Sequence, residues 1–529
     1  MAPVGATSLL KREERPSRRR RKTTAVPLIV SSLAVAAGGW LVAAQPGGGT
    51  AVSRARLGPE MPATAMSVPA RPANNSPVLR ADPTNERFVV LANRVDAPEY
   101  VCSLQLSGDG GRTWLPANPV PTLPPGAEKC FGGEVAFQRD GRLQYLFVGL
   151  VGEGNEPMGV FLTSSADRGR TFSPARQVLG PRNFSVRMAL DPTIGKQGRI
   201  HLVWVHATSD PPPGGFGTPP NPIMGAHSDD GGRTFSTPLQ VSDPDRERVL
   251  APSVAVGADH RVHVAYYDLL DDARDYQALE GPVWDGTWSL VVTTSSDAGR
   301  SFARGVVAEA EVAPHARVIA AYIMPPAALA ARDNLVCLAW TDARTGDADV
   351  WTRCSHDAGR RWGKAQRLND DPAGTGHWQY LPGLDIAPGG RLDAVFYDRR
   401  KDPQNLNNDI VYTFSEDGGA SFAPNVQLNR HGSSIALVGA RYTVVSAAGQ
   451  YDFGNRMAVL SRRHEVIAAW TDTRNSAPQS TGQDIFTTVI SGMTPEGNAA
   501  PALAGGALLI MAGLGGLRVS WRRRFREVR

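Results

Sequence analysis

Three segments in the second half of the chain place an arginine two residues after an aspartate, with another aspartate further on. Successive side chains of a strand point to opposite faces, so the arginine and the first aspartate would share one face. Two carboxylates that face each other across a hairpin repel, and an arginine between them would offset the repulsion. The pattern is aromatic-x-Asp-x-Arg, and it occurs at Trp340–Arg344 before Asp349, Phe396–Arg400 before Asp409 and Trp470–Arg474 before Asp484.

This pattern has one structural and two functional interpretations. We favour the structural one, a buried Asp–Arg–Asp clasp that pins each loop, because repetition along a chain is typical of a structural device. The first functional interpretation is a ring of arginines that binds an acidic sugar, since a guanidinium binds a carboxylate with two parallel bonds; its members are Arg344, Arg400 and Arg474. The second is a Ca²⁺ site between the paired aspartates. Apart from Ca²⁺, we expect no metal and no cofactor.

A second pattern, Ser-x-Asp-x-Gly-x-[Thr/Ser]-[Trp/Phe], has six copies, and only Arg361 departs from its seventh position. The starts of the copies are 58, 63, 67, 60 and 60 residues apart. Such regular spacing indicates a repeat architecture. An aspartate accepts backbone N–H bonds in a tight turn, and glycine adopts backbone angles that other residues avoid. We therefore interpret these boxes as folding elements rather than catalytic groups; their aspartates are Asp109, Asp167, Asp230, Asp297, Asp357 and Asp417.

The segments around each box predict four short strands per repeat, which is typical of a β-propeller blade. The second strand of each repeat can be counted directly, at 88–94, 143–150, 200–207, 262–268, 335–342, 392–398 and 466–472. We therefore predict an all-β propeller of seven blades, with six as the alternative. The last repeat lacks its outermost strand, and residues 65–71 are a candidate to supply it.

Strand alternation also predicts which face could carry a site. In a four-stranded meander the boxes, which follow the third strand, lie on one face. The loops after the second strand lie on the other face, together with the arginines of the first pattern. Ligands of propellers commonly bind at the mouth of the central channel.

The box pattern resembles the Asp-box (bacterial neuraminidase) repeat of sialidases and other propellers. Sialidases bind the substrate carboxylate with three arginines and use an Asp acid/base and a Tyr–Glu nucleophile pair. By this resemblance Arg80 corresponds to the first arginine and Asp96 to the catalytic aspartate. The Ile-Pro that follows this arginine in sialidases is replaced here by Ala81-Asp82, and no suitable Glu accompanies Tyr442 or Tyr451. If the chain is an enzyme, the resemblance implies an exo-α-sialidase-like glycoside hydrolase.

The four cysteines suit an oxidising compartment. Aligning Asp342 with Asp349 across the predicted hairpin also sets Cys337 opposite Cys354, which favours a cross-strand disulfide. By elimination, Cys102 would pair with Cys130.

Two uncharged runs flanked by basic tails indicate a membrane protein. Residues 23–44 form a signal peptide or an anchor, and residues 499–517 a transmembrane helix, so apolar helices should flank the propeller on both sides. The positive-inside rule keeps the tails, 1–22 and 518–529, in the cytoplasm. The propeller, residues 77–490, then lies outside the cell membrane, between linkers at 45–76 and 491–498. Because the basic excess sits in the tails, we expect no nucleic-acid binding.

Two functional hypotheses follow. The first is a membrane-anchored, extracytoplasmic, sialidase-like propeller that binds or processes glycans at the cell surface. The second is a non-catalytic envelope scaffold that binds another protein. In both cases the terminal helices would contact membrane lipid.

Overall fold

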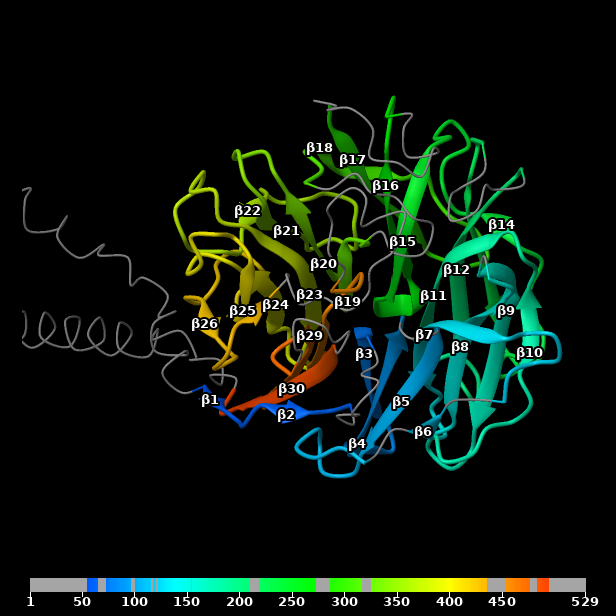
Figure 1. The fold of residues 1–529 in the computed structure, drawn as a ribbon. Coiled ribbons are helices and arrows are strands. Elements are labelled where there is room, and N and C mark those ends of the chain that lie inside the picture. Colours follow the sequence, from blue (N-terminus) through cyan, green and yellow to red (C-terminus); the bar gives the residue numbers. More distant parts are fainter. Residues whose placement is uncertain are drawn as a thin grey trace, which may run out of the picture. The chain divides into compact units, whose positions relative to one another are not determined.

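The computed structural model describes residues 55–64, 73–96, 100–115, 118–119, 122–153, 155–209, 218–272, 286–315, 325–434, 453–475 and 483–493. These residues form seven antiparallel sheets of four or five strands each, with one short 3-10 turn, η1 (Ala258–His260). The sheets are arranged around a central axis as the blades of a propeller (Figure 1). The predicted all-β fold and the seven blades are thereby confirmed.

In blades 1 to 3 the strands follow one another in chain order from the centre outwards. Blade 1 comprises β3 (Asn74–Asp82), β4 (Asn85–Val95), β5 (Val101–Ser107) and β6 (Asn118–Pro119); blade 2 comprises β7 (Lys129–Phe137), β8 (Leu143–Val151), β9 (Glu156–Ser165) and β10 (Arg176–Leu179); and blade 3 comprises β11 (Asn183–Asp191), β12 (Arg199–His206), β13 (Ile223–Ser228) and β14 (Leu239–Gln240).

Blades 4 to 6 repeat this order, and β27 (Ser433–Ser434) adds to the third strand of blade 6. Blade 4 comprises β15 (Val249–Val256), β16 (Val262–Asp268), β17 (Trp288–Ser295) and β18 (Val306–Val312); blade 5 comprises β19 (Ala328–Arg332), β20 (Leu335–Asp342), β21 (Asp349–Ser355) and β22 (Gln366–Arg367); and blade 6 comprises β23 (Gln379–Ile386), β24 (Leu392–Asp398), β25 (Asn407–Ser415) and β26 (Val426–Gln427).

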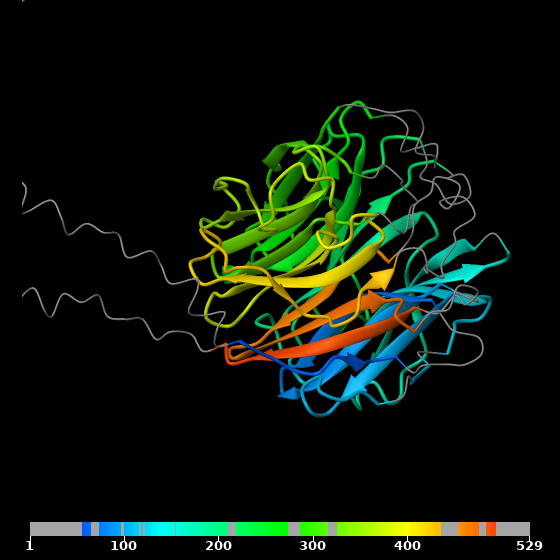
Figure 2. The ribbon, with the colours of Figure 1, turned by 60° about the vertical axis from the view of Figure 1, so that its left-hand side comes forward.

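Blade 7 is built from both ends of the propeller. Its inner strands are β28 (Ala458–Ser461), β29 (Glu465–Asp472) and β30 (Asp484–Ser491), and its outer edge is supplied by β1 (Arg56–Leu57) and β2 (Met61–Pro62). Arg56 pairs with Ser491 and Met61 with Thr487. Figures 1 and 2 show this blue segment beside the orange-red β30. The strands that complete blade 7 therefore come before residues 65–71, the segment expected to supply its outermost strand, which lies outside the described residues.

The innermost strands bulge at the same register in five blades. Each bulge contains a residue with positive φ, and these residues are Ser76, Gly132, Ser185, Ala251 and Leu381. A bulge re-aims the side chains that follow it. Because each innermost strand contacts the innermost strands of both neighbouring blades, the re-aimed side chains can reach across blades: the hydroxyl of Ser253 in blade 4 donates to the carbonyl of Ala327 beside blade 5.

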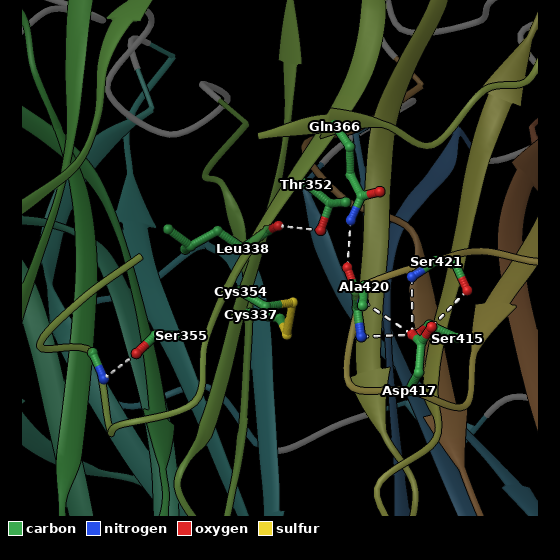
Figure 3. Close-up of a disulfide and its surroundings, with 12 residues drawn as sticks. Cys337, Leu338, Thr352, Cys354, Ser355, Gln366, Ser415, Asp417, Ala420 and Ser421 are labelled. Carbon is green, nitrogen blue, oxygen red and sulfur yellow. Dashed lines mark hydrogen bonds between the residues drawn. A yellow bond between two sulfur atoms is a disulfide. The ribbon is translucent and has the colours of Figure 1, made fainter. Parts of the chain in front are cut away.

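The boxes occupy the turns after the third strands of blades 1 to 6, on what we call the box face. In blade 6, Asp417 accepts bonds from the Ser415 and Ser421 hydroxyls at 2.7 and 2.6 Å and from two backbone N–H groups at 2.9 Å (Figure 3). Gly419 of this box packs against Cys354 of blade 5, so closely that a Cβ atom would collide with the sulfur. Each box therefore closes its own turn and also fits against the preceding blade.

Two disulfides are present among the described residues. Cys337–Cys354 joins β20 to β21 inside blade 5 (Figure 3). Cys102–Cys130 joins β5 of blade 1 to β7 of blade 2.

The flanking apolar segments 23–44 and 499–517 lie outside the described residues, as do the two basic tails. Within the part of the chain that the structure describes, no helix has the length and apolar character needed to cross a membrane.

Candidate anion-binding site at the channel mouth

Two arginines from two blades contact one glutamate among the innermost strands, and a third arginine lies nearby. We call the face opposite the boxes the channel face. Arg187 of β11 donates from Nη1 to Oε1 of Glu134 in β7 at 2.9 Å, and Arg456, just before β28, pairs with the same oxygen. Arg456 also donates to the carbonyl of Ser76 at 3.3 Å. Arg80 of β3 lies close enough to influence the ionisation of Glu134. Blades 1, 2, 3 and 7 thus contribute to one charged cluster.

The electrostatics of this cluster leave an excess of positive charge. Burial disfavours the charged form of Glu134, but Arg456, Arg187 and Arg80 outweigh burial and hold its pKa below the usual value. Burial, together with the like charge of Arg456, lowers the pKa of Arg187 to about 10, so Arg187 stays protonated at neutral pH. Burial also lowers the pKa of Arg80. Among the described residues Arg80 forms no ion pair, and its guanidinium donates to the carbonyl of Leu79 at 2.8 Å.

A cavity of about 50 Å³ opens beside the cluster. A single water needs roughly 10–15 Å³ of such space, so the cavity holds a few water-sized groups. A carboxylate group is of this size, whereas a whole sugar ring is not. The cavity is lined by side chains that include Ser76, Arg94, Phe131, Glu134, Arg187 and Arg456.

Asp96, which the resemblance pairs with Arg80, is bonded elsewhere. Its two carboxylate oxygens accept bonds from Nε and Nη2 of Arg94 at 2.6 and 2.7 Å, and from Asn75 at 2.6 Å. Arg94 in turn lies over the ring of Phe131 at 4.8 Å and borders the cavity. The side chain of Asp96 is only 1% exposed, so this carboxylate positions Arg94 and does not face the cavity as a free acid.

Two further ionisable groups accompany the cluster. Tyr145 of β8 is fully buried, and burial together with Glu134 raises its pKa well above the usual value despite the opposing effect of Arg456. A phenol that stays protonated is a poor nucleophile. Asp385 of β23 lies near Arg80, and burial raises its pKa to about 6, although the backbone N–H groups of Ser461 and Ile386 donate to it.

The three arginines of the aromatic-x-Asp-x-Arg pattern do not join this cluster. Arg344 bonds to Asp342, pairs with Glu309 of blade 4 at 3.5 Å and lies over the ring of Trp351 at 4.7 Å. The other two repeat this arrangement: Arg400 bonds to Asp398 and pairs with Asp370, and Arg474 bonds to Asp472 and pairs with Glu60.

Each arginine therefore pairs with at least two carboxylates, but none of the partners is the expected aspartate across the hairpin. In blade 5 the hairpin aspartate, Asp349, is bonded by Asn369 at 2.6 Å and Arg367 at 3.0 Å instead. The expected bridge was wrong because the outer strands and neighbouring blades bring other charged groups closer. Among the described residues, no group of three or more His, Cys, Asp or Glu side chains is placed to hold a metal ion.

Sequence reasoning did not single out Glu134, Arg187 or Arg456. A signal was present, because each lies three residues after a phenylalanine that is followed directly by a glycine or serine. The three segments are Phe131–Glu134, Phe184–Arg187 and Phe453–Arg456. Aligning the first strands of the repeats, rather than the second strands alone, would have revealed this register.

The strand order, the six boxes and the strand exchange between the two ends define the chain as a seven-bladed Asp-box β-propeller. No family model and no curated protein sequence matches the chain.

Solved structures similar to the chain include a protein of unknown function from Dyadobacter fermentans, with 13% identity, coverage of 83% of this chain and 99% of that chain, and a TM-score of 0.45. An ulvan lyase has 11% identity, coverage of 79% and 94%, and a TM-score of 0.43. A Hadza microbial sialidase has 15% identity, coverage of 77% and 74%, and a TM-score of 0.40.

Proposed function

We propose that this propeller binds acidic glycans, with Arg187 and Arg456, which line the cavity at the channel mouth, binding the carboxylate of the sugar and Arg80 adding positive charge nearby. The observation that carries the proposal is the convergence of these arginines on a single internal carboxylate, Glu134. Three guanidiniums against the carboxylates of Glu134 and Asp385 leave positive charge in a poorly solvated space. An acidic ligand neutralises this charge through charge-assisted hydrogen bonds, whereas a neutral sugar does not.

The dimensions of the site suggest how the ligand is held. A cavity of about 50 Å³ admits the carboxylate group. The sugar ring therefore stays outside it, on the channel face. Specificity for the anionic group would come from the arginines, while the rest of the glycan extends away from the protein.

Among the described residues, which do not include Tyr442 and Tyr451, the geometry favours binding without hydrolysis. Sialidase-like hydrolysis needs an aspartate that can donate a proton and a reactive tyrosine. Asp96 is instead held by Arg94 and Asn75. Tyr145, which lies beside Glu134, is buried with a raised pKa.

We further propose that the propeller is attached to the outer face of the cell membrane through both of its ends. Support comes from the pairing of Arg56 with Ser491, which sets the first and last described strands side by side. Ile490 pairs with Val466 in blade 7 in the same way that the first box residue, Ser415, pairs with Leu392 in blade 6. The end of β30 and the start of β1 therefore lie on the box face. Seven residues, 492–498, lie between Ser491 and the predicted span at 499–517, and the eight steps from Ser491 to residue 499 reach at most about 29 Å. The channel face then points away from the membrane.

The test is binding of glycans by the full chain, purified in neutral detergent. A glycan array should retain the protein on sialylated or uronic-acid glycans and not on their neutral counterparts. Arg187→Ala should abolish this retention, whereas Arg170→Ala, which removes an exposed arginine of the box face, should not. Hydrolysis of a fluorogenic sialoside, measured on the same sample, tests the enzymatic alternative. A folded protein that binds no acidic glycan would overturn the proposal in favour of a protein-binding scaffold.

A further inference from the structure

A second and larger cavity lies on the box face, between blades 2 and 3. Its volume is about 510 Å³, which falls within the range of roughly 300–1,000 Å³ that is typical of small-ligand sites. Three arginines line it: Arg142 just before β8, Arg176 at the start of β10 and Arg233 in the box of blade 3. The cavity is separate from the channel, and none of its lining residues belongs to the Glu134 cluster.

The lining of this groove has an excess of positive charge, because three arginines face one aspartate, Asp230. Among the described residues, none of the three arginines forms an ion pair. Arg176 donates instead to the backbone carbonyls of Gly232 and Arg233, which fixes its guanidinium beside the box. Asp230 contributes one negative charge to the groove, and its oxygens are held inside the box by bonds from Ser228 and from the backbone and hydroxyl of Thr234.

A buried amide supplies an independent sign of a ligand. Gln138, in the lining of the groove, has no solvent exposure, and neither its side-chain oxygen nor its nitrogen has a hydrogen-bond partner within the described protein. Leaving such a group without a partner costs free energy. Beside it, the Gln144 amide donates to the carbonyl of Gly231 at 3.3 Å, and the hydroxyls of Thr163 and Ser164 complete the polar wall.

We propose that this groove binds a phosphate group carried by a small polar molecule. A phosphate carries more negative charge than a carboxylate and offers more acceptor oxygens, which matches three arginines together with amide and hydroxyl donors. Two sources share this chemistry: the headgroup of an anionic phospholipid and a free phosphorylated sugar or polyol. Binding of a phospholipid headgroup rests on the proposed membrane attachment, which sets the box face toward the bilayer. The phosphate site itself does not depend on that attachment.

The experiment measures the affinity of the full chain, in neutral detergent, for glycerol 1-phosphate and for short-chain phosphatidylglycerol by calorimetry. Glycerol 1-phosphate should bind, and both Arg142→Ala and Arg233→Ala should weaken that binding by at least about tenfold, the loss expected for one charge-assisted hydrogen bond. Arg170→Ala is the matched control, because Arg170 holds the same box position in blade 2 as Arg233 in blade 3 and does not line the groove. Thermal unfolding verifies that each variant folds.

The results separate this site from the channel and one ligand source from the other. Arg187→Ala should leave glycerol 1-phosphate binding unchanged, so a failure of the proposed glycan site is distinguishable from a failure here. Tighter binding of phosphatidylglycerol than of glycerol 1-phosphate supports the lipid source, and the reverse supports a free phosphorylated ligand. Absence of binding by the folded wild type, or equal weakening by Arg170→Ala, overturns the proposal, since either result reduces the groove to unspecific surface charge.

Discussion

Arg187 of blade 3 donates a 2.9 Å hydrogen bond to Glu134 of blade 2, so one ion pair links neighbouring blades at the channel mouth. Arg456 of blade 7 pairs with the same Glu134 oxygen, which extends the link across blade 1. The side chains that hold these blades together are therefore the ones that we propose bind the ligand. Glu134 competes with a ligand carboxylate for the same guanidiniums.

This competition predicts opposite effects for two substitutions at one ion pair. Arg187→Ala removes a donor and should weaken binding of an acidic glycan by at least about tenfold. Glu134→Gln removes the competing charge, and the affinity should rise. Titration calorimetry with the best glycan of the array measures both, and equal weakening by the two substitutions would contradict direct competition.

The box of blade 6 should be structural. Asp417→Ala removes the acceptor of bonds from Ser415, Ala420 and Ser421, so the free energy of unfolding should fall by about 2 kcal/mol or more. Glycan binding per folded molecule should remain. Urea unfolding followed by tryptophan fluorescence gives the stability, and a loss of binding in fully folded protein would show that the box has a role beyond folding.

Asp385 should make stability depend on pH. Its pKa is raised to about 6 in the folded protein from an ordinary value of 3.8, so the folded state binds more protons between these values and stability falls as the pH rises through this window. Asp385→Asn cannot ionise and should escape this loss. The difference in free energy of unfolding between Asp385→Asn and wild type should therefore grow in favour of the variant by up to about 3 kcal/mol from pH 4 to pH 6.5.

Thermal unfolding across this pH range compares the two proteins, with Glu311→Gln as a control at an exposed carboxylate. Parallel curves for wild type and Asp385→Asn would rule out the ionisation of Asp385 as the cause.

The disulfide of blade 5 should contribute to stability. Cys337 and Cys354 are 17 residues apart, and a cross-link over a loop of this size stabilises by about 3 kcal/mol. Replacing both with alanine should lower stability by about this amount and also loosen the contact with Gly419 of the next box. Chemical unfolding of the double variant, beside wild type with and without reductant, makes the comparison; a stability change below about 1 kcal/mol would argue against the cross-link.

The arginine clasps should stabilise blades without contributing to ligand binding. Arg344→Ala leaves Asp342, which is fully buried, without its cationic partner, and removing one member of a buried pair costs about 3–5 kcal/mol. Its affinity for acidic glycans should match that of wild type. An Arg344→Ala variant that has normal stability but fails to bind acidic glycans would show that Arg344 contributes to ligand binding.

The sequence alone determined the features that depend on near neighbours. The seven second strands gave the blade number, and the six boxes were identifiable because Asp417 and its partners lie within a few residues of one another. The pairing of Cys337 with Cys354 followed from the register of one hairpin. Strand alternation also separated the box face from the channel face. Local turn chemistry and the two-residue period of a strand suffice for such conclusions.

Only the tertiary structure decided which charged groups meet across blades. Arg344 reaches Glu309 of the preceding blade, and Arg456 reaches Glu134 although the two are distant in sequence. Closing the ring brings blade 7 beside blade 1, and the bulges re-aim the side chains of the innermost strands toward the channel. Such partners depend on the packing between blades, which no single repeat encodes, and for this reason Glu134, Arg187 and Arg456 were absent from the sequence prediction, which named only Arg80.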